Sequence, residues 1–181
     1  MAHRAPVQIA AYSPQWPQQF AAERAVLAVV FPRSAFQIEH IGSTAVPGLA
    51  AKPIVDVLLG AKTLAEIEAR IPATQALGYQ YMPEHEVVLP QRRFFAKPVH
   101  RPRQFHLHAV QLDSLFWVEH LLFRDSLRSD PSLAQEYLLL KLQLAARFGD
   151  DREGYTDAKS SFIRSVVHRA QAAPIHGSVG A

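Results

Sequence analysis

The sequence predicts a single α+β domain, in which a mixed, mostly antiparallel sheet is covered by helices and followed by a helical C-terminal segment. The length of 181 residues fits one domain rather than two. Strand-like apolar segments fall within about residues 35–112, and helical spacing dominates about residues 113–172. Residues 173–181 are rich in small side chains, so we expect a flexible tail after a domain of residues 1–172.

Helical spacing begins close to the N-terminus. Ser13 is expected to cap a helix that starts at Pro14, because serine accepts a hydrogen bond from the first turn and proline suits the first helical position. The helical spacing stops at Phe31, which a proline follows. Residues 35–41 then alternate between apolar and polar side chains, which predicts a strand.

The segment 52–59 is nearly continuous in apolar character, which is typical of a central strand. Gly60 is expected to end this strand, and Thr63 to cap a helix over residues 63–77. Further strands are predicted over residues 78–81, 92–97 and 104–111, the last two antiparallel to each other. Helices are predicted over residues 114–127, 130–148 and 151–172, with Gly149 ending the second of them.

The composition excludes several kinds of chemistry. The sequence contains no cysteine, which rules out disulfides, thiolate zinc sites and cysteine nucleophiles. No apolar run approaches the roughly 18 residues that a membrane-spanning helix needs, and residues 1–6 lack the apolar stretch of a signal peptide. We therefore expect a cytoplasmic protein without a membrane partner. The net charge of +3 fits an anionic small molecule as well as a nucleic acid.

The strongest local signal is the pair formed by Gly42-Ser43 at the end of one predicted strand and Asp56 inside the next. Glycine lets the backbone approach a bulky ligand, and the serine hydroxyl and nearby amides can bind phosphate oxygens. A carboxylate on the neighbouring strand can hold a divalent metal against the same phosphates. Alternatively, Gly42-Ser43 is only a turn, and Asp56 pairs with Lys52 or Arg93.

The central segment, residues 38–56 (IEHIGSTAVPGLAAKPIVD), resembles the signature of the GrpB-like family. Shorter blocks match the family in its order, at residues 12–17, 77–79, 92–95, 106–108, 123–125 and 155–159. The resemblance covers about residues 6–170 and implies a nucleotidyltransferase-type fold of poorly assigned activity. Some relatives are fused to dephospho-coenzyme A kinase, which points towards nucleotide or coenzyme A chemistry.

The sequence departs from the usual nucleotidyltransferase pattern, which places two carboxylates two residues apart on the strand after Gly-Ser. Leu58 stands at the second position here, and a later strand offers His106 and His108 where a third carboxylate is usual. These histidines share one face because strand side chains alternate. A two-metal carboxylate cage is therefore not expected. The site could bind one metal through Asp56, Glu39 and a histidine, or none.

The candidate catalytic residues are therefore Asp56, Glu39, His106 and His108. The candidate ligands for Mg²⁺ or Mn²⁺ are Asp56, His106 and His108. The two histidines could instead donate to phosphate or be satisfied polar groups of the core. Glu39 and His40 point to opposite faces of their strand, so at most one of them faces the site.

The candidate phosphate contacts are Gly42, Ser43 and Thr44 of the predicted turn, together with the basic residues Lys52, Arg93, Lys97 and Lys159. Arg93 and Lys97 are four apart on a predicted strand, so they share a face and are expected to flank the site. Tyr155 and Lys159 lie one helical turn apart and either close the pocket over a ligand or form an ordinary surface pair. Lys141 is a further basic residue of the late helices.

The first functional hypothesis is a nucleotide-handling protein with a phosphate-containing small molecule as its ligand and nucleotidyl transfer as its reaction class. The second is a non-catalytic module that binds a nucleotide or a coenzyme A precursor, which Leu58 favours. The third is a metal-dependent phosphohydrolase that uses His106 and His108. Nucleic acid is not the expected partner, because no aromatic-and-basic motif of a recognised RNA-binding module is present.

Overall fold

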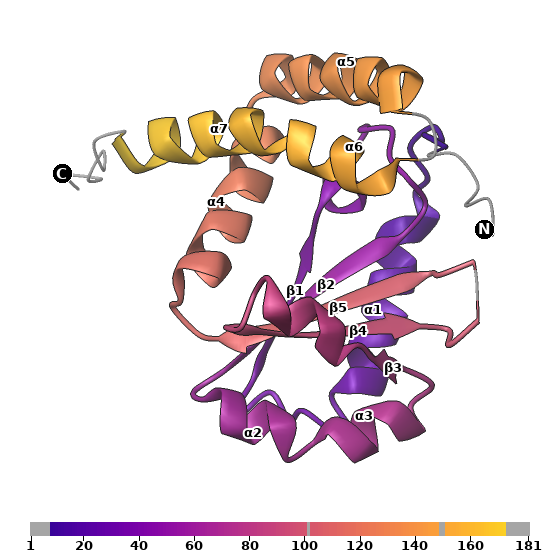
Figure 1. The fold of residues 1–181 in the computed structure, drawn as a ribbon, viewed down its shortest axis with the longest axis vertical. Helices are drawn as coiled ribbons and strands as arrows, with labels where there is room; N and C mark the ends of the chain where they lie inside the picture. The colour runs from indigo at the N-terminus through magenta and orange to yellow at the C-terminus, as the bar shows by residue number, and fades with distance from the viewer. Residues whose placement is uncertain (1–7, 101, 149–150, 173–181) are drawn as a thin grey trace, which may run out of the picture.

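A computed structural model describes residues 8–100, 102–148 and 151–172 (Figure 1). Its strands form one sheet in the order β1-β2-β5-β4-β3. In chain order they are β1 (Gln37–Ile41), β2 (Val55–Ala61), β3 (Gln80–Tyr81), β4 (Arg92–Lys97) and β5 (Phe105–Gln111). The central strands β2 and β5 run parallel, and the other neighbouring pairs are antiparallel. The predicted α+β class with a mixed, mostly antiparallel sheet is confirmed.

The helices divide between the two faces of the sheet (Figure 1). Those that pack against one face are α1 (Gln15–Leu27), α2 (Leu64–Glu68) and α3 (Ile71–Ala76). Those gathered over the other face are α4 (Leu115–Ser129), α5 (Pro131–Phe148), α6 (Arg152–Ala158) and α7 (Ser160–Ala172). Two short 3₁₀ turns, η1 (Ser43–Ala45) and η2 (Pro83–Val87), follow β1 and β3.

The alternation of side chains along β2 assigns its residues to two different surroundings. Val55, Val57 and Leu59 join the main core, together with residues of α1 and α2 such as Leu27 and Ile67. The even-numbered residues of β2 face the C-terminal helices. There Leu58 is fully buried in a second cluster that includes Trp117 of α4, and Asp56 shares this face.

Gly60 does not end the central strand, as its position in the sequence had suggested. It lies inside β2, paired with Gln37 on one side and Val110 on the other. A Cβ atom at this position would overlap the Leu112 side chain and lie 2.8 Å from the Trp117 ring. Glycine is therefore present because Leu112 and, from α4, Trp117 pack directly on the strand backbone.

Gly60→Ala is expected to lower the free energy of unfolding by about 1–3 kcal/mol, because the added methyl group overfills a packed contact. Urea denaturation of the variant beside the wild type measures this difference. Unchanged stability would mean that α4 does not press on β2 in the way that the structure places it.

Other boundaries also differ from the sequence pattern. The helix predicted over residues 63–77 is two helices, α2 and α3, because Pro72 lacks the amide that would continue the hydrogen-bond ladder. Its predicted cap is confirmed, since Thr63 accepts from the Glu66 amide in a capping box. The helix predicted over residues 151–172 is divided into α6 and α7. Gly149 and residues 173–181 lie outside the described residues.

No helix among the described residues combines the length and the apolar character that crossing a membrane requires.

Candidate functional site

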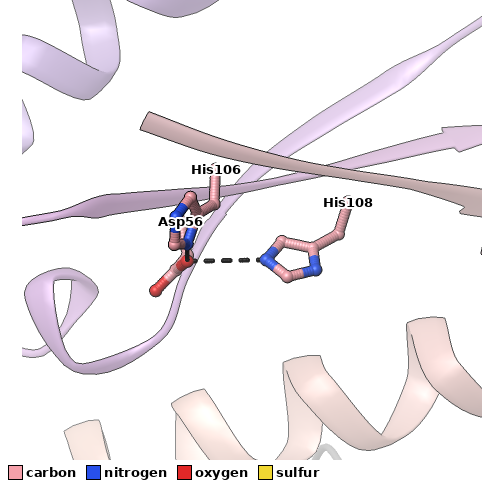
Figure 2. Close-up of side chains that lie close together, drawn as sticks. All are labelled: Asp56, His106 and His108. Atoms are coloured by element: carbon pink, nitrogen blue, oxygen red, sulfur yellow. Dashed lines mark hydrogen bonds and ion pairs between the residues drawn. The ribbon is translucent and has the colours of Figure 1, made fainter. Parts of the chain in front are cut away.

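The sheet brings Asp56 of β2 beside the two histidines of β5. The parallel register pairs Asp56 with His106 and Leu58 with His108, and all four side chains face the C-terminal helices. The Asp56 Oδ1 atom lies 3.3 Å from Nδ1 of His106 and 3.4 Å from Nε2 of His108 (Figure 2). The three ligating atoms lie within 4.8 Å of one another, which is the spacing of a candidate metal centre.

Gly42 is required where the chain turns away from β1. Its φ of +71° lies in the region that favours glycine, and a Cβ atom would lie 2.6 Å from the Asp56 Oδ2 atom. The turn therefore presses against the carboxylate and limits where it can point. Ser43, the next residue, lines a cavity that lies beside Asp56.

Thr44 lines the same cavity but its hydroxyl has internal partners. It lies 3.0 Å from Nε2 of His40 and donates to the Ile54 carbonyl at 3.4 Å. His40 itself is buried and stacked on Phe20 of α1, with its pKa lowered to about 4 because burial disfavours the charged ring. Thr44 and His40 thus tie β1 to the segment before β2.

A cavity of about 280 Å³ opens between the Asp56 cluster and the C-terminal helices. Asp56, His106 and Ser43 form one part of its wall. The remainder includes Lys52 and side chains from α5, α6 and the residue after α6, namely Lys141, Tyr155, Thr156 and Lys159. A carboxylate–histidine cluster and a group of lysines therefore face one another across a space of small-molecule size.

Two of these lysines are held in surroundings that disfavour their charge. Lys141 is 2% exposed, and its Nζ donates to the Ala50 carbonyl at 2.5 Å. Burial, with the charge of Lys159 nearby, lowers the pKa of Lys141 to about 7. Burial also lowers the pKa of Lys159 to about 8, with its Nζ 4.2 Å above the Tyr155 ring. Among the described residues neither lysine has a carboxylate within ion-pair distance, although the charge of Asp56 acts on Lys159 from farther away. An anion entering the cavity would therefore meet amines that no ion pair engages.

The sequence identified Lys141 only as a basic residue of the late helices and did not place it among the candidate phosphate contacts. It lies four residues after Tyr137 on the apolar stripe of α5, where a charged residue is unusual. That position within the stripe was the signal for a buried lysine.

Arg93 and Lys97 were expected to flank the site, and the structure places them on the other face of the sheet. Arg93 pairs with Glu68 of α2 at 2.5 Å and with Glu86 at 3.2 Å. Lys97 pairs with Glu23 of α1 at 2.9 Å. Strand alternation explains this, because the face of β4 towards Asp56 carries Arg92, Phe94 and Ala96 instead.

Arg92 is the basic residue of β4 that reaches the cluster. Its Nη1 atom lies 3.1 Å from Nδ1 of His108, and its guanidinium lies over the rings of Phe94 and Phe116. His108 therefore has Arg92 on one ring nitrogen and Asp56 on the other.

Glu39 shares the Asp56 face of the sheet but has a different partner. Its register partner is Leu58, and its Oε2 atom accepts from Arg124 of α4 at 2.7 Å. Arg124 also donates to the His40 carbonyl. Glu39 anchors α4 to β1 in this arrangement and is not among the atoms that could share a metal with Asp56.

The electrostatics keep Asp56 ionised. Burial alone would raise its pKa, but the hydrogen bonds and charge supplied by His106 and His108 outweigh burial and hold the pKa well below its usual range. The pKa of His108 falls to about 4, because burial disfavours the charged ring more than Asp56 favours it. The cluster is thus an anionic carboxylate beside at least one neutral imidazole.

A profile described as GrpB protein matches residues 6–169. The chain belongs to the GrpB family. It is 38% identical over 173 residues to a UPF0157 protein of Pseudomonas aeruginosa, covering 94% of this chain and 70% of that one. It is 35% identical to the UPF0157 protein YqkA of Bacillus subtilis, covering 91% of this chain and 47% of that one. A dephospho-CoA kinase of Mycolicibacterium paratuberculosis is 29% identical, with 92% of this chain matched to 46% of the kinase.

Solved structures agree with the family assignment. The GrpB protein of Enterococcus faecalis superposes with a TM-score of 0.80 and 35% identity, over 90% of this chain and 96% of that chain. The GLD-2/RNP-8 complex gives a TM-score of 0.56 at 13% identity, covering 91% of this chain and 62% of that one. The Cid1 poly(U) polymerase gives 0.52 at 13% identity, covering 77% and 44%. The nucleotidyltransferase-type fold of this GrpB-family chain is therefore confirmed.

Proposed function

We propose that this protein binds a nucleotide, or another small molecule with several phosphates, in the cavity above Asp56, together with a divalent cation. The observation that carries the proposal is the cavity itself, in which a carboxylate–histidine cluster faces Lys52, Lys141 and Lys159. Phosphate oxygens need cationic donors, and a divalent cation needs an ionised carboxylate, so both halves of the cavity suit one ligand.

Two comparisons support a nucleotide as that ligand. The Cid1 structure that shares the fold contains Mg and 3′-dATP, and one relative in sequence is a dephospho-CoA kinase. In the proposed arrangement Lys141 and Lys159 contact the phosphates, and Ser43 adds a hydroxyl at the turn after β1. Asp56 holds the cation with histidine nitrogen beside it. The donor set fits Mn²⁺, which accepts oxygen and nitrogen ligands together.

Nucleotidyl transfer is the reaction class that the fold implies. A divalent cation in this site would neutralise phosphate charge and polarise a phosphoryl oxygen. The lysines of the cavity wall would hold the phosphates close to the face of the sheet that carries Asp56. His106 lies on the cavity wall beside Asp56, where its Nδ1 atom could join Asp56 in holding the cation.

A binding module without turnover is the second candidate, and Leu58 favours it. Two-metal transfer needs carboxylates that bridge two ions about 4 Å apart. Leu58 occupies the position two residues after Asp56 and is fully buried against Trp117. Glu39, the other nearby carboxylate on this face, is paired with Arg124. Neither residue can complete a second ion site as the chain is folded.

We therefore expect ATP binding in the micromolar range with Mn²⁺ or Mg²⁺, and transferase turnover that is weak or absent with Mg²⁺. Any turnover should be faster with Mn²⁺, because Mn²⁺ accepts imidazole ligands more readily than Mg²⁺ does. Calorimetric titration measures the binding, and labelled nucleoside triphosphates with a panel of acceptors measure the turnover.

Lys159→Met should weaken ATP binding by at least about tenfold, the loss expected when one charge-assisted contact to phosphate is removed. Lys62→Met is the matched control, because Lys62 is exposed and does not line the cavity. Equal ATP affinity in the two variants would place the ligand elsewhere.

In the turnover assay, rapid Mg²⁺-dependent transfer would contradict the binding-module candidate. Hydrolysis without an acceptor would instead indicate a phosphohydrolase.

A further inference from the structure

Arg92 lies in surroundings that a cation does not ordinarily occupy. Among the described residues it has no carboxylate partner, and its Nε atom is buried without a hydrogen bond. Its guanidinium lies 5.0 Å from the centre of the Phe94 ring and 5.7 Å from that of Phe116. The hydrogen bond that its side chain makes in the described structure goes to Nδ1 of His108, at 3.1 Å. An arginine held there at the cost of an unsatisfied donor suggests a role in setting the state of His108.

The hydrogen bond from Arg92 decides where the His108 proton lies. A guanidinium has only donors, so Nδ1 of His108 must accept and carries no proton. A neutral imidazole has one proton, which is then on Nε2. Nε2 is the atom that faces Asp56, 3.4 Å from Oδ1 (Figure 2). Donation therefore runs in one direction, from Arg92 to His108 and from His108 to Asp56.

The same arrangement removes His108 from the set of metal ligands. Histidine binds a metal through a nitrogen lone pair, and a protonated Nε2 has none to offer. His106 differs, because no arginine or lysine of the described chain donates to its ring. Its Nδ1 atom lies 3.3 Å from the Asp56 oxygen, on the wall of the cavity.

We propose that Arg92 is a metal-selectivity residue, which keeps His108 as a hydrogen-bond donor to Asp56 and so prevents a three-ligand Asp–His–His zinc site. This inference rests on the proposed role of Asp56 as a cation ligand. With Arg92 in place, the protein offers one carboxylate and one imidazole, and leaves the other coordination positions to water and phosphate oxygens. That arrangement suits Mg²⁺ or Mn²⁺, whereas three protein ligands with two imidazoles suit Zn²⁺.

Arg92→Gln tests the proposal through a gain of zinc affinity. The glutamine carbonyl can accept from Nδ1–H of His108, which is the partner that metal-bound histidines commonly have on their second nitrogen. Nε2 then becomes free to bind a metal. Zinc affinity measured by calorimetry without nucleotide should rise about 10- to 100-fold, the usual size of an outer-shell effect. Mn²⁺ affinity should change much less, and bound Co²⁺ should acquire the visible absorption of a nitrogen-rich site.

Three further variants separate this mechanism from loss of charge or loss of fold. Arg92→Lys keeps a charged donor and should bind Zn²⁺ as the wild type does. Arg92→Met removes the donor but fills the space between Phe94 and Phe116, and should show a smaller gain in the same direction. The double variant Arg92→Gln with His108→Ala should lose the gain, because the new ligand is absent. Circular dichroism of each variant checks that the fold is retained.

Several results would overturn the proposal. Wild-type protein that binds Zn²⁺ as tightly as Arg92→Gln would show that His108 is already a ligand. A gain that survives His108→Ala, or a gain of equal size for Zn²⁺ and Mn²⁺, would trace the effect to the lost guanidinium charge. The failure of the proposed function is a different result, namely wild-type protein that binds neither Mn²⁺ nor ATP.

Discussion

Replacing Asp56 with asparagine is expected to raise the Kd for Mn²⁺ by at least about 100-fold while the fold is retained. The amide has nearly the shape of the carboxylate but lacks the negative charge that a hard cation needs. Retention of shape matters because the Gly42 turn leaves little space around this side chain. The Asn oxygen can still accept from the histidines, so the sheet keeps its local contacts. Nucleotide binding that depends on the cation should fall in parallel.

Calorimetric titration of Mn²⁺ into the wild type and Asp56→Asn measures this effect. Asp113→Asn is the control, since Asp113 is an exposed carboxylate in the turn before α4. Its positive φ of 60° is a conformation that asparagine also adopts. Equal Mn²⁺ affinity in wild type and Asp56→Asn would show that Asp56 is not a cation ligand, and its partners would then be only the two histidines.

Phosphate binding is expected to weaken steeply between pH 7 and pH 9. A lysine is charged below its pKa, and burial lowers the pKa of Lys141 to about 7 and that of Lys159 to about 8. A phosphate ligand needs the charged forms, so its affinity is greatest at lower pH and is lost as pH rises through these values. A lysine with a pKa near 7 keeps roughly 1% of its charge at pH 9, which limits the loss from that residue to on the order of 100-fold.

Asp56 and Tyr155, which also line the cavity, do not produce this pH dependence. Asp56 remains ionised across the window because its pKa is lowered, and Tyr155 remains neutral because burial raises its pKa to about 12. Lys52 and His106 also face the cavity. Lys159→Arg isolates the share of Lys159, because arginine stays charged to pH 9 and should flatten the decline. An unchanged pH profile in Lys159→Arg would contradict a direct contact between Lys159 and the ligand.

The stability of the ligand-free protein should change with pH in the opposite direction. Unfolded lysines have the ordinary pKa of about 10.5, so above pH 7 the unfolded chain binds more protons than the folded one. Unfolding free energy contributed by Lys141 and Lys159 therefore rises with pH, while stabilisation by added ATP falls. Thermal denaturation at pH 7 and pH 9, with and without ATP, measures both trends on one sample.

The sequence predicted the elements whose signals are local. The cap at Thr63, the two strands β4 and β5 and the helices α4 and α5 follow from side-chain periodicity and punctuation by serine, threonine, glycine and proline. The divided helices and the internal Gly60 were not predicted. In the sequence Gly60 has the character of a strand end, and it is the Leu112 and Trp117 side chains packed over it that explain a glycine inside β2.

The sequence also determined which residues of the site are unusual. An aspartate in an apolar strand needs a partner or a ligand, and two histidines with one residue between them must share a strand face. Both features, and the turn at Gly42, can be recognised from the amino-acid sequence alone. Their meeting is not, because it depends on β2 pairing in parallel with β5 and on Asp56 lying opposite His106 in that register.

Only the tertiary structure decided which basic residues belong to the site. Arg92 and Arg93 are adjacent in sequence and point to opposite faces of β4, so one reaches His108 and the other pairs with Glu68. Strand periodicity gives two faces but does not say which of them meets the ligand. Lys141 reaches the cavity because α5 packs across the segment before β2, where its amine contacts the Ala50 carbonyl 91 residues away in sequence. Such a contact depends on how distant elements pack, which no local pattern of side chains encodes.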